Sequence, residues 1–109
     1  MLEYQKFQYV LRGIIDMYKC IIVPGIKDKK MYKSSASFID DILEGVIYAS
    51  NEMPTDYKEY GYVNKLIVNL RVLNTNLIKH DESSIPISMN ILEHIINHLE
   101  PIASPKEEK

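Results

Sequence analysis

The sequence has no tryptophan, a single cysteine and no long apolar run. A membrane-spanning helix needs about 18 or more apolar residues in succession, so we expect no transmembrane segment. Cys20 alone cannot form an internal disulfide, which agrees with a reducing compartment. The chain begins Met-Leu-Glu-Tyr, without a basic flank or a small-residue cleavage site. We therefore expect no signal peptide and a cytoplasmic location.

The composition is that of one soluble, compact domain. The chain has 109 residues, of which 46% are hydrophobic and 26% are charged, and this length supports a single core. We expect one domain over residues 1–103, followed by a disordered charged tail over 104–109, "SPKEEK". The net charge of −2 gives no general attraction to nucleic acid, so such contact would need a local basic patch.

Apolar residues recur at spacings of three and four in four segments, which is typical of amphipathic helices. The stripes of the first two comprise Tyr4, Phe7, Leu11, Ile14, Tyr18 and Ile21, and then Phe38, Ile39, Ile42, Leu43, Val46 and Ile47. Pro24-Gly25 is expected to end the first helix, because proline lacks a backbone N–H. The second is expected to begin near Ser34 or Ser35 and to end before Pro54.

The third and fourth segments have the same character. Their stripes comprise Tyr60, Val63, Leu66, Ile67, Leu70, Leu73 and Leu77, and then Ile85, Leu92, Ile95, Ile96, Leu99 and Ile102. The third helix is expected to run from Thr55 or Asp56 to about His80. The fourth is expected to run from Pro86 to Glu100, where the following proline ends it. Short connections between such helices predict an all-α, antiparallel up-down-up-down four-helix bundle.

The third helix has a second apolar face. Val68 and Val72 are spaced i, i+4 and lie on the side opposite its stripe. Tyr9 also lies well off the stripe of the first helix. The core of one chain cannot reach these side chains, so the pattern predicts contact with a second protein chain.

The residues that carry catalytic chemistry form no recognisable active site. His94 and His98 can chelate a metal at i, i+4 spacing, but they lie opposite the stripe of the fourth helix, and we interpret them as solvated. Cys20 has no histidine near it in sequence to lower its pKa. Asp40 and Asp41 are interpreted as solvated acids near a helix N-terminus. We expect a protein that is not an enzyme and that binds no cofactor or metal.

Basic residues cluster between the first and second helices, in "KDKKMYK". The residues that could contact the phosphates and bases of RNA are Arg12, Lys19, Lys27, Lys29, Lys30, Tyr32 and Lys33. Tyr32 is the one expected to be available for stacking on a base. A solvated basic loop is the alternative interpretation of this cluster.

The order of these features resembles the Avd-like four-helix-bundle family. This family includes the accessory variability protein of diversity-generating retroelements and bundle proteins encoded in intervening sequences of 23S ribosomal RNA genes. The resemblance covers about Tyr4 to Leu99 and rests on three motifs. They are the basic-aromatic run from Lys30 to Tyr32, then Leu43-Glu44 with Ile47 and Ala49, and then Leu70-Arg71-Val72-Leu73.

The resemblance implies a ring-like homopentamer without a catalytic site, which binds a reverse transcriptase and its template RNA. On this hypothesis Tyr9, Val68, Arg71 and Val72 would contact a neighbouring protomer or the polymerase. The chain departs from the family in its slightly acidic charge and in "NTN" over 74–76, where basic residues are common. These departures keep open a second hypothesis, a bundle of the same fold that binds only protein.

Overall fold

The computed structural model describes residues 2–28, 30–51 and 59–103. Its elements are α1 (Leu2–Met17), a π-helical turn η1 (Tyr18–Ile22), α2 (Val23–Lys27), α3 (Tyr32–Asn51), α4 (Glu59–Ile78) and α5 (Ile85–Ala103). No strand occurs within these ranges. The continuous rod α1–η1–α2 counts as one long helix, so the predicted all-α, antiparallel up-down-up-down four-helix bundle is confirmed.

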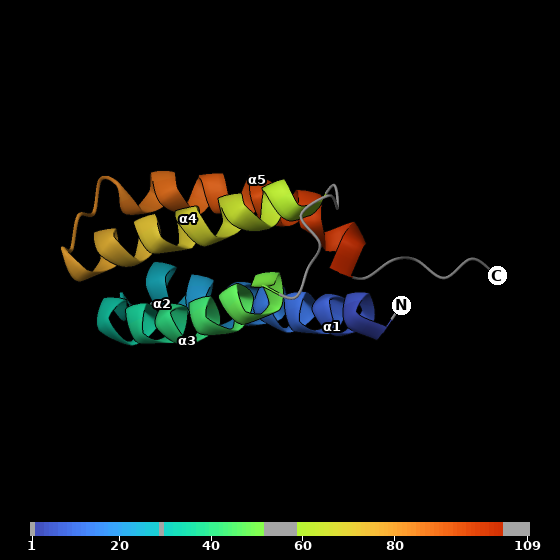
Figure 1. The fold of residues 1–109 in the computed structure, drawn as a ribbon. Coiled ribbons are helices and arrows are strands. Elements are labelled where there is room, and N and C mark those ends of the chain that lie inside the picture. Colours follow the sequence, from blue (N-terminus) through green and yellow to red (C-terminus); the bar gives the residue numbers. More distant parts are fainter. Residues whose placement is uncertain (1, 29, 52–58, 104–109) are drawn as a thin grey trace.

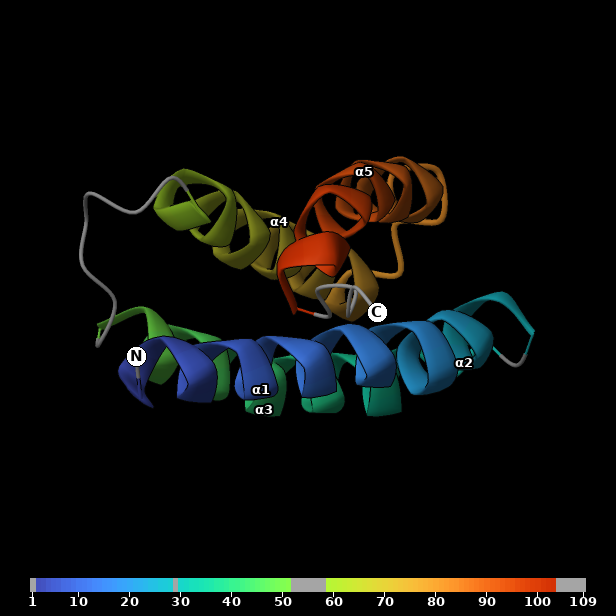
Figure 2. The same ribbon diagram turned by 90° about the vertical axis from the view of Figure 1, so that its right-hand side faces the viewer.

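The bundle has two layers. The rod α1–η1–α2 and the antiparallel α3 form one layer, and the hairpin of α4 and α5 covers it (Figures 1 and 2). Each long helix packs against the next one in the chain, and α5 packs back on α1. Helices α1 and α4 are therefore diagonal in the bundle, a relation that determines where their outer faces point.

The first helix does not end at Pro24-Gly25 as the sequence predicted, but continues to Lys27. In η1 the N–H of Val23 donates to the carbonyl of Tyr18, five residues back. This wider turn accommodates the proline, which cannot donate and would otherwise crowd the carbonyl four residues before it. The extra residue also changes the helical phase, so Ile22 is buried and the predicted stripe residue Ile21 is exposed.

The remaining helix boundaries differ from prediction by a few residues. Helix α3 begins at Tyr32 rather than at Ser34 or Ser35, and Ser35 is buried. Pro54 and the start predicted for the third helix at Thr55 or Asp56 lie outside the described residues. The tail 104–109 also lies outside them.

Helix α5 continues through Pro101 to Ala103, although a proline was expected to end it. Only the final turn follows the proline, so little of the helical hydrogen bonding is lost. Gln8 on α1 donates from Nε2 to the carbonyl of Ile102 at 2.9 Å, which satisfies one of the last free carbonyls. Ala103 is buried at the same end.

Helix α4 ends in a Schellman motif. The N–H of Asp81 donates to the carbonyl of Asn76, and the N–H of His80 donates to that of Leu77. His80 is left-handed, with φ of 57°, where glycine is usual. The helix therefore ends at Ile78, two residues before the predicted His80.

The core matches the predicted stripes of α4 and α5 closely. Val63, Leu66, Leu70, Leu73 and Leu77 are all buried. On α3, the stripe residue Phe38 is exposed, contrary to prediction, while its neighbour Ile39 is fully buried.

Candidate functional site

The exposed apolar face predicted on α4 is present. Val68 and Val72 are 56% and 44% exposed, on a helix whose opposite side is fully buried. The neighbouring helix α5 carries two further exposed apolar residues that the sequence analysis did not single out, Ile87 and Ile91, at 62% and 43%. Their i, i+4 spacing on an amphipathic helix was the signal that could have identified them.

Two contacts fix the antiparallel register between α4 and α5. Asn76 donates from Nδ2 to Oγ of Ser88 at 2.8 Å, and Tyr62 stacks on His98 with ring centroids 3.8 Å apart. This register puts Val72 level with Ile91 across the seam between the helices. We call Val68, Val72, Ile87 and Ile91 the outer α4–α5 patch.

The other predicted interface residues lie apart from one another. Arg71 is exposed on α4, next to Val72 in sequence. Tyr9 is 81% exposed on α1, the helix diagonal to α4. The structure thus separates the predicted interface into a patch on the α4–α5 layer and a tyrosine on the other layer.

The predicted RNA-contacting residues do not form one continuous surface. Arg12, Lys27, Lys30 and Lys33 are exposed, and Lys29 lies outside the described residues. Lys19 forms an ion pair with Glu100 at 2.8 Å, with both side chains partly exposed.

Tyr32 is buried at 8% exposure, which argues against its expected role as a stacking platform. Its ring packs on that of His80, with centroids 5.2 Å apart and planes tilted by 57°. The contact joins the start of α3 to the end of α4, so Tyr32 contributes to packing at this end of the bundle.

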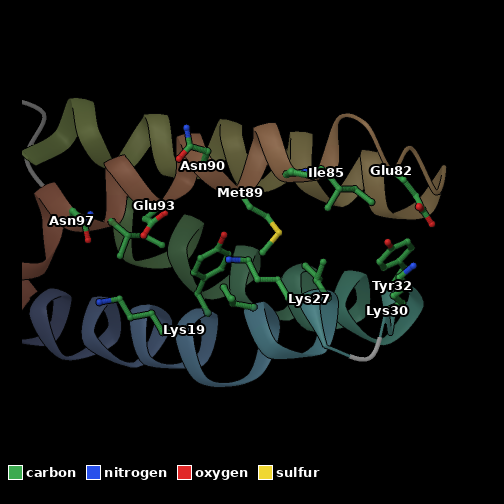
Figure 3. Close-up of a pocket in the computed structure, with 15 residues that line it drawn as sticks. Lys19, Lys27, Lys30, Tyr32, Glu82, Ile85, Met89, Asn90, Glu93 and Asn97 are labelled. Atoms are coloured by element: carbon green, nitrogen blue, oxygen red, sulfur yellow. The ribbon is translucent and has the colours of Figure 1, made fainter.

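A groove of about 640 Å³ opens between the rod η1–α2 and helix α5 (Figure 3). Lys19, Lys27 and Lys30 line one wall, and Glu82, Asn90, Glu93 and Asn97 line the other. Apolar side chains between them come from Val23, Ile26, Ile85, Met89 and Ile96. Its volume and mixed lining are typical of a small-molecule site.

Tyr18 is the least expected member of the groove. Its side chain lines the groove at only 4% exposure, and its buried hydroxyl has no hydrogen-bond partner among the described residues. Burial, and secondarily the charge of Glu93, raises the pKa of this hydroxyl above its ordinary value. The group therefore stays protonated and is available as a donor. The spacing of apolar residues in the sequence had placed Tyr18 only in the core.

The remaining candidate residues have simple surroundings. His94, His98 and Cys20 are all exposed, and the ring of His98 also stacks on that of Tyr62. Within residues 2–28, 30–51 and 59–103, no group of three or more His, Cys, Asp or Glu side chains is arranged to hold a metal ion.

None of the described helices is long and apolar enough to cross a membrane. No family model, curated protein or solved structure matches the chain. What the protein does must therefore be inferred from its own residues.

Proposed function

We propose that this chain is a non-enzymatic, oligomeric accessory protein that binds a reverse transcriptase and its template RNA, as in a diversity-generating retroelement. Two observations support the proposal. One is the resemblance carried by the motifs in α3 and α4. The other is an exposed apolar surface at the position where the resemblance implies a partner.

The outer α4–α5 patch is the observation that carries the proposal. Single exposed apolar side chains are common on proteins and need no explanation. Here two pairs at i, i+4 spacing, Val68 with Val72 and Ile87 with Ile91, follow neighbouring helices. Covering such a seam removes apolar area from water at about 25 cal/mol per Å², which favours association.

The position of Tyr9 supports a ring. Tyr9 and the outer α4–α5 patch belong to opposite layers of the bundle. A contact between two different surfaces of neighbouring copies is heterologous, and it closes into a ring when the rotation between copies allows. The homopentamer implied by the resemblance is such a ring.

Template RNA would contact the basic segment between α2 and α3. Lys27, Lys30 and Lys33 are exposed within a short stretch of chain, and Lys29 lies among them in sequence. Ammonium groups placed in this way bind the phosphates of RNA without recognising its base sequence.

A protein-only interaction bundle is the second candidate. Lys19 is held by Glu100, Tyr32 is buried, and Glu82 lies along the same groove as Lys30. These features reduce the basic surface that RNA could use, but they leave the outer α4–α5 patch unchanged.

Charge reversal separates the two candidates. The variant Lys29→Glu with Lys33→Glu should weaken RNA binding in the complex with the reverse transcriptase, and should flatten its dependence on salt, because fewer counterions are released. Lys6→Glu, an exposed lysine on α1 outside the basic segment, is the control. Polymerase binding with unchanged RNA affinity and salt slope would favour the protein-only bundle. If the wild-type protein bound neither the reverse transcriptase nor its template RNA, the proposal would be rejected.

A further inference from the structure

The groove between η1–α2 and α5 has a donor that no group in the described part of the chain satisfies. A buried hydroxyl without a partner is unfavourable, because it has given up its hydrogen bonds to water. Tyr18 is more than nine-tenths buried, and its hydroxyl has no partner within the described part of the chain. Since the hydroxyl keeps its proton, it can donate to an acceptor that a ligand supplies.

A cation lies in the same groove. Figure 3 shows the Lys27 side chain extending along the middle of the groove beneath Met89. Lys27 forms no ion pair among the described residues. An ammonium group and a hydroxyl donor within one groove favour a ligand with a negatively charged acceptor.

The rest of the groove favours an apolar body. Ile26 on the rod faces Ile85 and Met89 on α5, and all three are buried side chains. They would cover a hydrocarbon chain but would offer no hydrogen bond to a sugar or a base.

We propose that this groove binds a small amphipathic carboxylate, whose oxygens accept from the Tyr18 hydroxyl and pair with Lys27 while its alkyl chain packs on Ile26, Ile85 and Met89. The site is separate from the outer α4–α5 patch. A partner helix lying over the groove fits less well, because it would meet the exposed charges of the rim rather than the buried hydroxyl.

Glu93 makes the charge of the ligand testable. Its carboxylate lines the groove near enough to Tyr18 to affect the pKa of the hydroxyl. It repels an anion and would attract a cation. Neutralising Lys27 and neutralising Glu93 should therefore shift the affinity for an anionic ligand in opposite directions.

The test is calorimetric titration of the full chain with dodecanoate, and with dodecanol as the uncharged probe. Tyr18→Phe removes only the hydroxyl and should weaken dodecanoate binding about tenfold, as expected for a hydrogen bond to a charged group. Lys27→Gln should weaken binding to a similar extent, and Glu93→Gln should strengthen it. Lys33→Gln, which neutralises an exposed lysine outside the groove lining, should leave it unchanged.

The same variants give a second readout that does not need the ligand. If the hydroxyl lacks a partner in the free protein, Tyr18→Phe should raise the melting temperature by a few degrees while dodecanoate affinity falls. Equal binding of dodecanol and dodecanoate, or wild-type affinity in Tyr18→Phe, would overturn the proposal. An equal loss of dodecanoate affinity in Lys33→Gln and Lys27→Gln would also overturn the proposal, since binding would then depend on the overall charge of the protein. The groove proposal depends on Tyr18 and Glu93, which are not among the residues proposed to contact RNA or the polymerase, so failure of the dodecanoate test would leave the proposed polymerase function standing.

Discussion

Asn74 on α4 donates a hydrogen bond from Nδ2 to Oδ1 of Asp40 on α3, with the two atoms 2.6 Å apart. The sequence had suggested a solvated acid at Asp40 and a lost basic residue at position 74. Asp40 is exposed, as expected, but Asn74 is buried, so a polar side chain of the core is tied to a carboxylate at the edge of the neighbouring helix. Asn74 therefore has a structural role in the contact between α3 and α4.

Removing the carboxylate should destabilise the bundle. In Asp40→Ala the buried Asn74 amide loses its partner, at a cost of about 1.5–3 kcal/mol for a hydrogen bond to a charged group. Asp41→Ala removes an exposed neighbour on the same helix and should change stability by less than about 0.5 kcal/mol. Urea unfolding of the two variants measures the difference. Equal effects would mean that the Asn74–Asp40 bond contributes nothing specific.

His80 tests the Schellman motif at the end of α4. Its left-handed backbone is strained for any residue with a Cβ, whereas glycine adopts it freely. His80→Ala and His80→Gly both lose the ring contact with Tyr32, so only the backbone distinguishes them. We expect the glycine variant to be more stable than the alanine variant by about 1–2 kcal/mol in thermal unfolding. Equal stabilities would show that this position is not held left-handed.

The raised pKa of the Tyr18 hydroxyl predicts that the stability of the folded protein falls at alkaline pH. Its folded-state pKa is raised above the ordinary value of about 10. Above that pH the unfolded chain loses the proton while the folded chain keeps it, so the folded state binds more protons and stability falls as pH rises. The decline attributable to this group is at most about 1.4 kcal/mol per pH unit.

The measurement compares urea midpoints of wild type and Tyr18→Phe from pH 8 to about pH 11. The difference between the two proteins should be constant below pH 9 and should move in favour of the phenylalanine variant from about pH 10. Parallel curves across the whole range would mean that Tyr18 ionises in the folded protein as readily as in the unfolded chain.

The sequence predicted the helical phase well where nothing interrupts the helix. In α4, spacings of three and four placed Leu66, Leu70 and Leu77 inside and Val68 and Val72 outside, as observed. It failed where backbone geometry changes. The π turn before Pro24 exposes Ile21, which was expected to be buried, and the spacing of apolar residues gives no sign of such a turn.

The candidate site was harder to predict, because its residues come from different helices. The lysines of the groove belong to the basic cluster predicted from the sequence. Their position across the groove from Glu93 depends on how α5 packs beside the rod. Tyr18 was assigned to the core from its spacing, which is correct. The missing partner of its hydroxyl is a property of the folded surroundings. A stripe of apolar residues at helical spacing predicts which side chains are buried, but it gives no information on their hydrogen bonds.

The central claim is that the outer α4–α5 patch is an interface between chains, and light scattering of the purified protein tests it most directly. Wild-type protein at tens of micromolar should have the mass of a closed oligomer. Val68→Asp with Val72→Asp should give monomers or smaller assemblies with helix content retained by circular dichroism, because both valines are exposed in the single chain. Tyr48→Asp, which charges an exposed side chain on α3, should leave the oligomer intact. A wild-type protein that is monomeric at this concentration, or a double variant that keeps the wild-type mass, would contradict the claim.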